Sequence, residues 1–314
     1  MRTCETRVVV LLVTLSVACA SAGGRTPAAP PLRLKIVLNK AEFFEGEPIH
    51  ALFELRNVSS GTVRIPPLGL SSGWLVGALH RADGSVVRVG RTVHVDYICH
   101  ETCNDDPVGP GGARYFPFIV QERWGEEVPS SYTMLYLNLA TGAYALDGSF
   151  QLDRVAGSTP VVASPFVFRV RPRRPAEDTA YQQFVRIGAK DVLTWTVADL
   201  DSALAWISRR LAADSADPFA LKVLILSFAH TAVHLQVDST EWARIFQVEL
   251  AIIKAQAASP IGAHAAAFRY GRGQPRNRDA RVTLCLTLAG TVAGDIACER
   301  EAWFARMEKA SPPD

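Results

Sequence analysis

Two histidines four residues apart are the first candidates for chemistry in this chain. His230 and His234 stand in a strongly apolar stretch that predicts a helix over residues 217–235. At this spacing both imidazoles lie on one helix face and could share a metal ion, with His264 or Asp238 as a third ligand from elsewhere in the chain. A metalloprotease helix has a glutamate base directly after its first histidine, and Thr231 stands there instead. Packing of both histidines at the edge of a helix face is therefore the favoured interpretation, and no metal site is predicted.

A second group of candidates is a cluster of arginines near the C-terminus. Arg272, Arg276 and Arg278 lie between two further arginines, Arg269 and Arg281, in a stretch with a single acid. Such a cluster could contact an anionic ligand or surface, so the first three are candidate contact residues. The whole chain balances 33 Lys and Arg against 31 Asp and Glu, for a formal charge of +2. This near-neutral balance argues against a dedicated nucleic-acid binder.

Trp124 is a further candidate contact residue, because it stands in an otherwise polar stretch over residues 121–127. An exposed tryptophan can anchor a partner, whereas a tryptophan that folds back would cover the neighbouring core. The chain contains no G-x-S-x-G, S-x-x-K, P-loop or G-x-G-x-x-G motif. We therefore predict no catalytic residue and no cofactor, and the sequence favours a protein that is not an enzyme.

Six cysteines divide into three groups along the chain. Two lie near the N-terminus, Cys99 is close to Cys103, and Cys285 and Cys298 are equally distant from a turn flanked by Gly290 and Gly294. Two elements folded back about that turn would bring the last two sulfurs together, so we predict disulfides Cys99–Cys103 and Cys285–Cys298. Cys99 and Cys103 are also ligand types for zinc, but no second pair with zinc-finger spacing accompanies them.

The N-terminus has the pattern of a secretory signal peptide. An apolar run over residues 8–18 follows two arginines and precedes small residues, which fits a cleavable signal over residues 1–22. Residues 15–19 also resemble a bacterial lipoprotein box, in which Cys19 would carry a lipid anchor. The stretch 23–31, rich in Pro, Ala and Gly, predicts a flexible tether. No apolar run is long enough for a transmembrane helix, so we expect an exported protein, periplasmic or extracellular.

Residues 32–171 carry the signals of strands. Apolar and polar residues alternate over 32–38, 49–57 and 143–152, and Asp83-Gly84 between two apolar runs predicts a hairpin. Eight or nine short strands without an intervening helix predict an antiparallel β-sandwich.

The segments at the two ends of this region resemble bacterial immunoglobulin-like sandwich domains. The opening carries Gly46-Glu47-Pro48-Ile49, and Gly142-x-Tyr144 and the run 164–170 resemble a late and a closing strand of the same class. Proteinase-inhibitor-like and macroglobulin-like modules share this style. The resemblance implies a fold and no catalytic residue.

Residues 172–175, between two prolines and rich in arginine, predict a solvated linker to an all-α domain over residues 176–314. Helices are expected to begin at Pro175, Pro218 and Pro260, and over 202–211 with Asp199 or Asp201 as the cap. Residues 282–289 alternate like a strand but also fit a helix. No sequence repeat with a fixed period is present, so the pattern does not predict a solenoid.

Together these features predict an exported, non-enzymatic binding protein of the cell envelope or the extracellular space, with a protein or an envelope component as partner. Two alternatives remain open. One is a hydrolase with a site between the two domains, and the other is a secreted proteinase inhibitor that presents the loop over residues 97–113 or 122–131.

Overall fold

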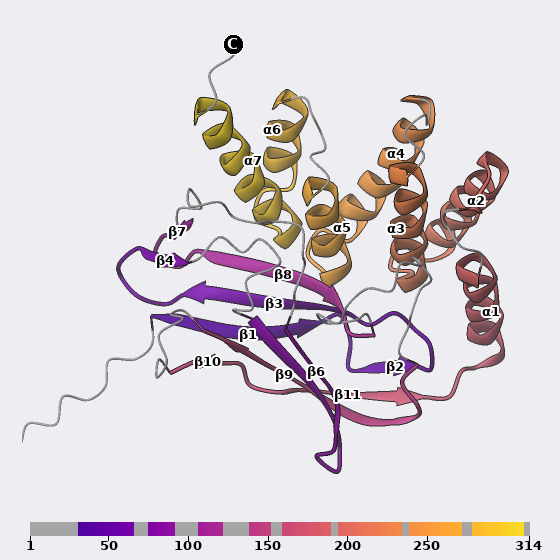
Figure 1. Cartoon of the computed structure of the whole chain (residues 1–314), viewed down its shortest axis with the longest axis horizontal. Helices are drawn as coiled ribbons and strands as arrows, with labels where there is room; N and C mark the ends of the chain where they lie inside the picture. Colours follow the sequence, from indigo (N-terminus) through magenta and orange to yellow (C-terminus); the bar gives the residue numbers. More distant parts are fainter. Residues whose placement is uncertain are drawn as a thin grey trace, which may run out of the picture. The chain divides into compact units, whose positions relative to one another are not determined.

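The computed structural model describes residues 31–65, 75–91, 106–121, 138–151, 159–189, 194–233, 239–271 and 278–310. Strands precede helices along the chain, so the protein is a β plus α structure, as the sequence predicts (Figure 1). Residues Pro31–Asp314 form one compact unit. Within the described residues, no helix combines the length and the apolar character that crossing a membrane requires.

The strands form two larger sheets and one short pair. The first sheet has the order β1-β3-β8, and its members are β1 (Leu32–Leu38), β3 (His50–Asn57) and β8 (Ala113–Ile119). The second has the order β2-β11-β9-β5-β6, from β2 (Glu42–Phe44), β11 (Phe166–Arg171), β9 (Gly142–Phe150), β5 (Leu75–Arg81) and β6 (Val86–Arg91), with β10 (Val161–Val162) beside β9. The short pair consists of β4 (Val63–Ile65) and β7 (Asp106–Val108).

One hydrophobic core lies between the two larger sheets. In β1 every second residue from Leu32 to Leu38 is buried, while Arg33 and Lys35 are exposed, because successive side chains of a strand point to opposite faces. These residues share a core with Phe53 of β3 and Leu146 of β9. The alternation read from the sequence therefore identifies the buried face correctly.

Three short strands are not predicted by the sequence pattern. The first is Glu42–Phe44, which forms β2 and pairs in parallel with β11. The strands β7 and β10 are likewise too short to show an alternation. Pairing with a distant strand, which the local pattern does not contain, makes these segments strands.

The helices of the described chain follow β11 in sequence. They are α1 (Pro175–Ala189), α2 (Val197–Ala213), α3 (Pro218–Val233), α4 (Ser239–Ala255), α5 (Pro260–Gly271), α6 (Arg278–Thr287) and α7 (Val292–Ala310). The expected starts at Pro175, Pro218 and Pro260 are confirmed, since proline lacks an N–H that the first helical turn does not need.

The start of α2 differs from the prediction. Thr196, not Asp199 or Asp201, is the N-cap, and the helix begins at Val197. Asp199 instead completes a capping box, in which its carboxylate accepts hydrogen bonds from the Thr196 backbone N–H and hydroxyl, both at 2.7 Å. The aspartate therefore lies three residues inside the helix, where it also favours the positive end of the helix dipole.

The ambiguous run over residues 282–289 contains the end of a helix. Leu284 and Leu288 are buried four residues apart, and Leu286 is 69% exposed. In a strand all three leucines would share one face, whereas in a helix Leu286 points away from the other two. The alternating leucines therefore do not indicate a strand here.

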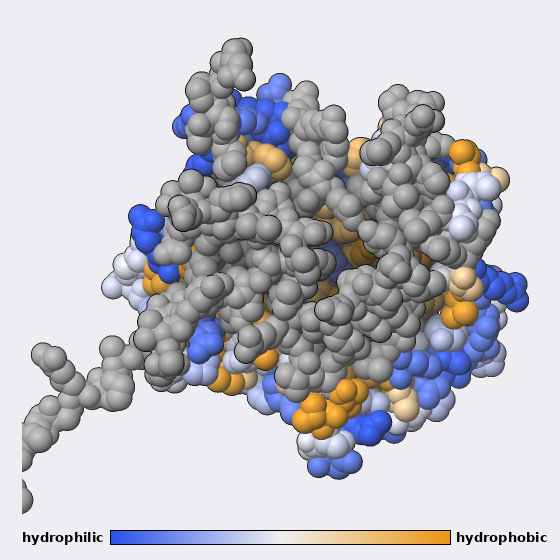
Figure 2. All heavy atoms as spheres, in the orientation of Figure 1, coloured by the Kyte–Doolittle hydropathy of each residue, from blue (hydrophilic) through white to orange (hydrophobic). Residues whose placement is uncertain are grey.

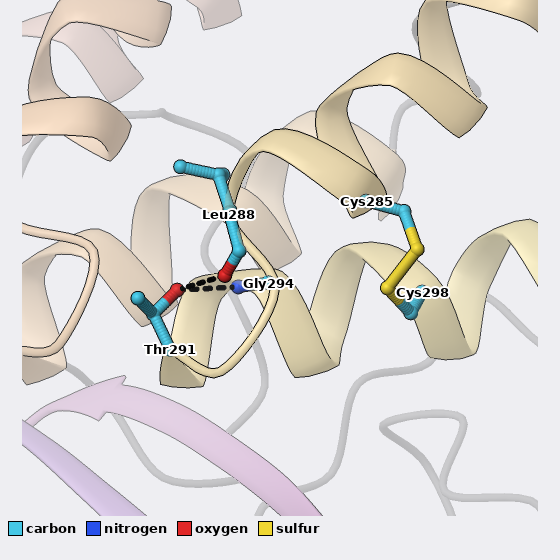
Figure 3. The surroundings of a disulfide bond; sticks show 5 residues. All are labelled: Cys285, Leu288, Thr291, Gly294 and Cys298. Atoms are coloured by element: carbon cyan, nitrogen blue, oxygen red, sulfur yellow. Dashed lines mark hydrogen bonds between the residues drawn. A yellow bond between two sulfur atoms is a disulfide. The ribbon is translucent and has the colours of Figure 1, made fainter.

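Three helical hairpins share the same connecting turn. They are α2–α3, α4–α5 and α6–α7, and in each the residue before the second helix caps it by accepting a hydrogen bond from the backbone N–H three residues later. The donor and acceptor pairs are Ala220 N to Asp217 at 3.0 Å, Gly262 N to Ser259 at 3.3 Å, and Gly294 N to Thr291 at 3.0 Å. Figure 3 shows the last of these turns, in which the Thr291 hydroxyl also donates to the Leu288 carbonyl at 2.6 Å.

The backbone of the three turns matches as well. The N–H of each capping residue donates to the carbonyl three residues earlier, which belongs to Asp214, Gln256 and Leu288. The caps are 42 and 32 residues apart in sequence. Because these two intervals differ, a search for a fixed sequence period does not find this structural repeat.

The strands and helices are joined through charged contacts at the end of β11. Arg171 donates to both oxygens of Glu177 at 2.7 and 2.6 Å and to Glu42 at 3.1 Å. Arg173 pairs with Asp178 at 2.8 Å and donates to the Glu45 carbonyl at 2.9 Å. Arg173 of the predicted linker, and Arg171 directly before that linker, thus each form an ion pair with an acid of the first helix. The division into separate domains at residues 172–175 stays a prediction.

Candidate binding pocket between α1 and α2

The described residues include one open pocket of about 330 Å³ between α1 and α2. Its lining combines apolar side chains with two guanidinium groups and consists of Gln183, Arg186, Ile187, Trp195, Asp199, Ser202, Ala203, Trp206 and Arg209. Pockets that bind small molecules commonly have this makeup of an apolar lining with a few polar groups that orient the ligand. Figure 2 shows hydrophilic side chains gathered on the surface around α1.

Arg186 of α1 and Arg209 of α2 supply the positive charge of the pocket. Both are exposed, and neither forms an ion pair within the described residues. By contrast, Arg210 of α2 pairs with Asp217. Arg244 of α4 likewise pairs with Asp201 of α2. The two pocket arginines therefore keep their planar donor groups available for an anionic ligand.

The tryptophans make the inner wall of the pocket. Trp195 is 5% exposed and Trp206 is 7% exposed, so both side chains are largely buried behind the pocket surface. Trp206 Nε1 donates a hydrogen bond of 2.9 Å to Gln183 Oε1, which fixes α1 and α2 relative to each other. This bond satisfies the indole N–H without a ligand, and the walls of the pocket are therefore held in place by the protein itself.

Two charge pairs with a buried arginine lie at matching positions of two described hairpins. Arg269 of α5 donates to Glu249 of α4 at 2.7 Å, and Arg281 of α6 donates to Glu301 of α7 at 2.6 Å, each pair 20 residues apart in sequence. The corresponding positions of the first hairpin are Ile207 and Ser227. The acid precedes the base along the chain in the hairpin α4–α5, and the base precedes the acid in the hairpin α6–α7.

Each arginine of these pairs also lies over an aromatic ring, Arg269 over Phe246 at 5.0 Å and Arg281 over Phe304 at 4.7 Å. Burial raises the pKa of Glu249 to about 7, and the charge of Arg269 opposes this rise. A shifted carboxyl pKa can mark a catalytic group, but this carboxylate is 0% exposed and faces its partner arginine across the hairpin. These pairs are therefore structural elements of the helical hairpins.

Polar interactions join the first sheet to the helices. His50 Nε2 lies 3.1 Å from the Pro218 carbonyl, and its ring lies edge-on to that of His264, with 5.7 Å between centroids. Tyr115 donates to Asp295 at 3.0 Å, and Arg114 lies 3.2 Å from Glu299. Burial and the adjacent Asp295 carboxylate raise the pKa of Tyr115 to about 12.

The histidine candidates are only partly described. His264 is half-buried in α5 and contacts His50, a residue that the sequence analysis did not single out. His230 belongs to α3, but its side chain lies outside the described part, and His234 lies outside it altogether. Over the described ranges, no group of three or more His, Cys, Asp and Glu side chains is arranged to hold a metal ion.

The disulfide Cys285–Cys298 is present between α6 and α7, as the sequence predicts (Figure 3). Cys99 and Cys103, the alternative anchor Cys19 and the predicted contact Trp124 lie outside the described residues, and so do Arg272 and Arg276.

Arg278 is described, and its side chain is 69% exposed and 3.9 Å from Glu301. Two other arginines of the same cluster, Arg269 and Arg281, are buried in the pairs above and are not available to a ligand.

The pocket residues form no motif that the sequence pattern alone reveals. The available signal is local: Trp206 and Arg209 lie three residues apart on one helix, as do Gln183 and Arg186 on another. That spacing places each pair on one helix face, but it does not show that the two faces meet. The packing of α1 beside α2 creates the pocket.

No known family model matches the chain, and no curated protein matches it in sequence. Among solved structures, it is similar at 10% identity to the CARDB domain of a Pyrococcus furiosus protein in complex with di-metal ions, over 46% of this chain and 96% of that chain, with a TM-score of 0.26. The sporulation control protein of Bacillus subtilis matches at 12% identity over 50% of this chain and 56% of that one, with a TM-score of 0.26.

A β-glucosidase of Listeria innocua in complex with gluconolactone matches at 13% identity over 44% of this chain and 16% of its own length, with a TM-score of 0.23. These scores are too low to support a common fold, and the named proteins differ in activity.

Proposed function

We propose that this protein is an exported, non-enzymatic binding protein of the cell envelope or the extracellular space. The pocket between α1 and α2 is the observation that carries the proposal, because Arg186 and Arg209, which form no ion pair among the described residues, present positive charge beside an apolar wall. Free guanidinium groups on a fixed scaffold are suited to recognition of an anionic group rather than to bond cleavage. The partner is a protein or an envelope component, and nucleic acid is not expected.

The strand-rich part supports this role as a scaffold. Two sheets that share one core fit an immunoglobulin-like sandwich over residues 32–171, the fold suggested by the segments at its two ends. Sandwiches of this class host many unrelated functions, so the sandwich does not identify the partner. The helical hairpins add a second surface, and repeated helical hairpins commonly serve as extended binding surfaces.

The two alternatives receive less support from the described residues. The described polar groups between the first sheet and the helices contact one another in pairs, such as Tyr115 with Asp295. A hydrolase would need several titratable groups that converge on one open point, and these pairs do not provide that arrangement. The inhibitor alternative depends on the loops over 97–113 and 122–131, which lie largely outside the described residues. Both alternatives stay predictions.

The proposal is tested by affinity capture from envelope extract with the chain from residue 23 onward. We expect a component that the natural protein retains and a variant with Arg186→Gln and Arg209→Gln does not. Turnover of generic ester, glycoside or peptide substrates by the purified protein, with no retained component, would contradict it. Intact-mass analysis after expression in a bacterium distinguishes cleavage after Ala22 from a lipid on Cys19, and an uncleaved cytoplasmic product would contradict export.

A further inference from the structure

We propose that the pocket between α1 and α2 binds an organic acid in which one carboxylate is attached to an apolar, preferably aromatic, body. This inference rests on the proposed binding function and names the chemistry of the ligand. The same chemistry occurs in a free aromatic acid and in the C-terminal residue of a peptide, and the experiment below distinguishes these two sources.

The charge of the pocket favours an anion. Arg186 and Arg209 approach it from different helices, and neither has an acidic partner in the described part of the chain. The one acid of the lining, Asp199, already accepts two hydrogen bonds from Thr196 in the capping box. Since the guanidinium group matches the planar, forked geometry of a carboxylate, two such groups can hold one carboxylate from two sides.

The remaining lining favours an apolar body next to that anion. The apolar lining residues are Ile187, Ala203, Trp195 and Trp206. Ser202 donates its hydroxyl proton to the Ala198 carbonyl at 2.8 Å, so its hydrogen-bond donor is already used within the helix. An inorganic anion alone would leave this apolar surface in contact with water, whereas an aromatic or aliphatic body would cover it.

The size of the pocket limits the ligand. A volume of about 330 Å³ is at the lower end of the range for small-molecule sites, which corresponds to roughly an amino acid or a small aromatic acid. The hydrogen bond from Trp206 to Gln183 holds the two helices together before any ligand arrives. A preformed pocket of this kind loses little conformational freedom on binding, which favours affinity for a small ligand.

The test uses the full exported chain and two probes that differ only in charge, N-acetylphenylalanine and N-acetylphenylalaninamide, followed by tryptophan fluorescence and isothermal titration calorimetry. We expect the free acid to bind, with at least about tenfold weaker binding of the amide, because the amide cannot form charge-assisted hydrogen bonds with the arginines. The same comparison with a short peptide ending in phenylalanine, free or amidated, shows whether a peptide terminus is also accepted.

Arg186→Gln and Arg209→Gln should each weaken binding of the acid by about tenfold or more. Arg169→Gln, which replaces an exposed arginine of β11 outside the pocket, is the matched control and should leave binding unchanged. Equal binding of acid and amide, or an unchanged affinity in both pocket variants that retain a native circular dichroism spectrum, would overturn the inference. If an envelope component is still captured by the double variant, the binding function stands and this pocket is not its site.

Discussion

The buried pair Glu249–Arg269 provides a quantitative test of how the helical hairpins are stabilised. Its two charges are withdrawn from water, yet Glu249 Oε1 and Arg269 Nε are buried without a hydrogen-bond partner among the described residues. The pair therefore recovers only part of its desolvation cost. Removal of one partner leaves an isolated buried charge, and this typically costs about 3–5 kcal/mol of unfolding free energy.

The first hairpin shows that the fold does not require this charge pair, since Ile207 and Ser227 occupy the matching positions. We expect Arg269→Met to lower the free energy of unfolding by about 3 kcal/mol at pH 8. The double variant Glu249→Leu with Arg269→Met should be within about 1 kcal/mol of the natural protein, because replacing both charges with apolar side chains of similar size removes the desolvation cost as well.

The effect of Arg269→Met should also depend on pH. The pKa of Glu249 is raised to about 7 in the folded protein, above its ordinary value of 4.5. Its carboxyl thus favours folding fully below pH 4.5, and this contribution is lost as the pH rises through about 7. The natural protein and Arg269→Met should therefore differ less at pH 5, where the carboxyl is protonated, than at pH 8.

The assay is urea-induced unfolding followed by far-ultraviolet circular dichroism at both pH values. Arg244→Met is the matched control, because Arg244 pairs with Asp201 at the surface and both side chains are about half exposed. That variant should cost less than about 1 kcal/mol. A double variant whose destabilisation equals the sum of the two single changes would refute the reasoning, since the residues would then not act as a pair.

Three further predictions concern other parts of the fold. Gly46→Ala should destabilise the protein by more than Gly84→Ala, as measured by urea unfolding. Both glycines have φ near +80°, but only at Gly46 would a Cβ overlap the Tyr181 ring. Equal losses of stability in the two variants would contradict this prediction. Reduction of the disulfide between α6 and α7 should cost about 3 kcal/mol, and unchanged unfolding midpoints with and without reductant would count against it. Arg171 holds the pKa of Glu177 at about 2, so stability should fall as the pH drops from 4.5 toward 2, and Glu177→Gln should flatten that decline in an acid titration.

Local pattern in the sequence accounts for much of the secondary structure. The alternation over residues 32–38 identifies β1 and its buried face, and prolines at 175, 218 and 260 mark three helix starts. The equal distances of Cys285 and Cys298 from a glycine-flanked turn predict the disulfide. These features depend on neighbours within a few residues or on one reversal of the chain, so the sequence pattern is sufficient to reveal them.

Other elements depend on segments that are far apart in sequence. The strand β2 exists through its pairing with β11, more than a hundred residues later, and α6 is a helix despite its alternating leucines because Leu284 and Leu288 pack against the helical core. In these cases tertiary contacts outweigh a weak or misleading local pattern.

By itself, the sequence determined a β plus α chain and the positions of its main strands and helices, and it predicted an export signal. The tertiary structure decided which polar side chains meet. It buried Arg269 and Arg281 of the predicted basic cluster against acids of neighbouring helices. It also brought Arg186 and Arg209 to one pocket, where neither pairs with an acid in the part of the chain that the structure describes. The physical reason is that an arginine is available to a ligand only where the packing of helices leaves its charge unpaired, and the residues that decide this lie on other helices.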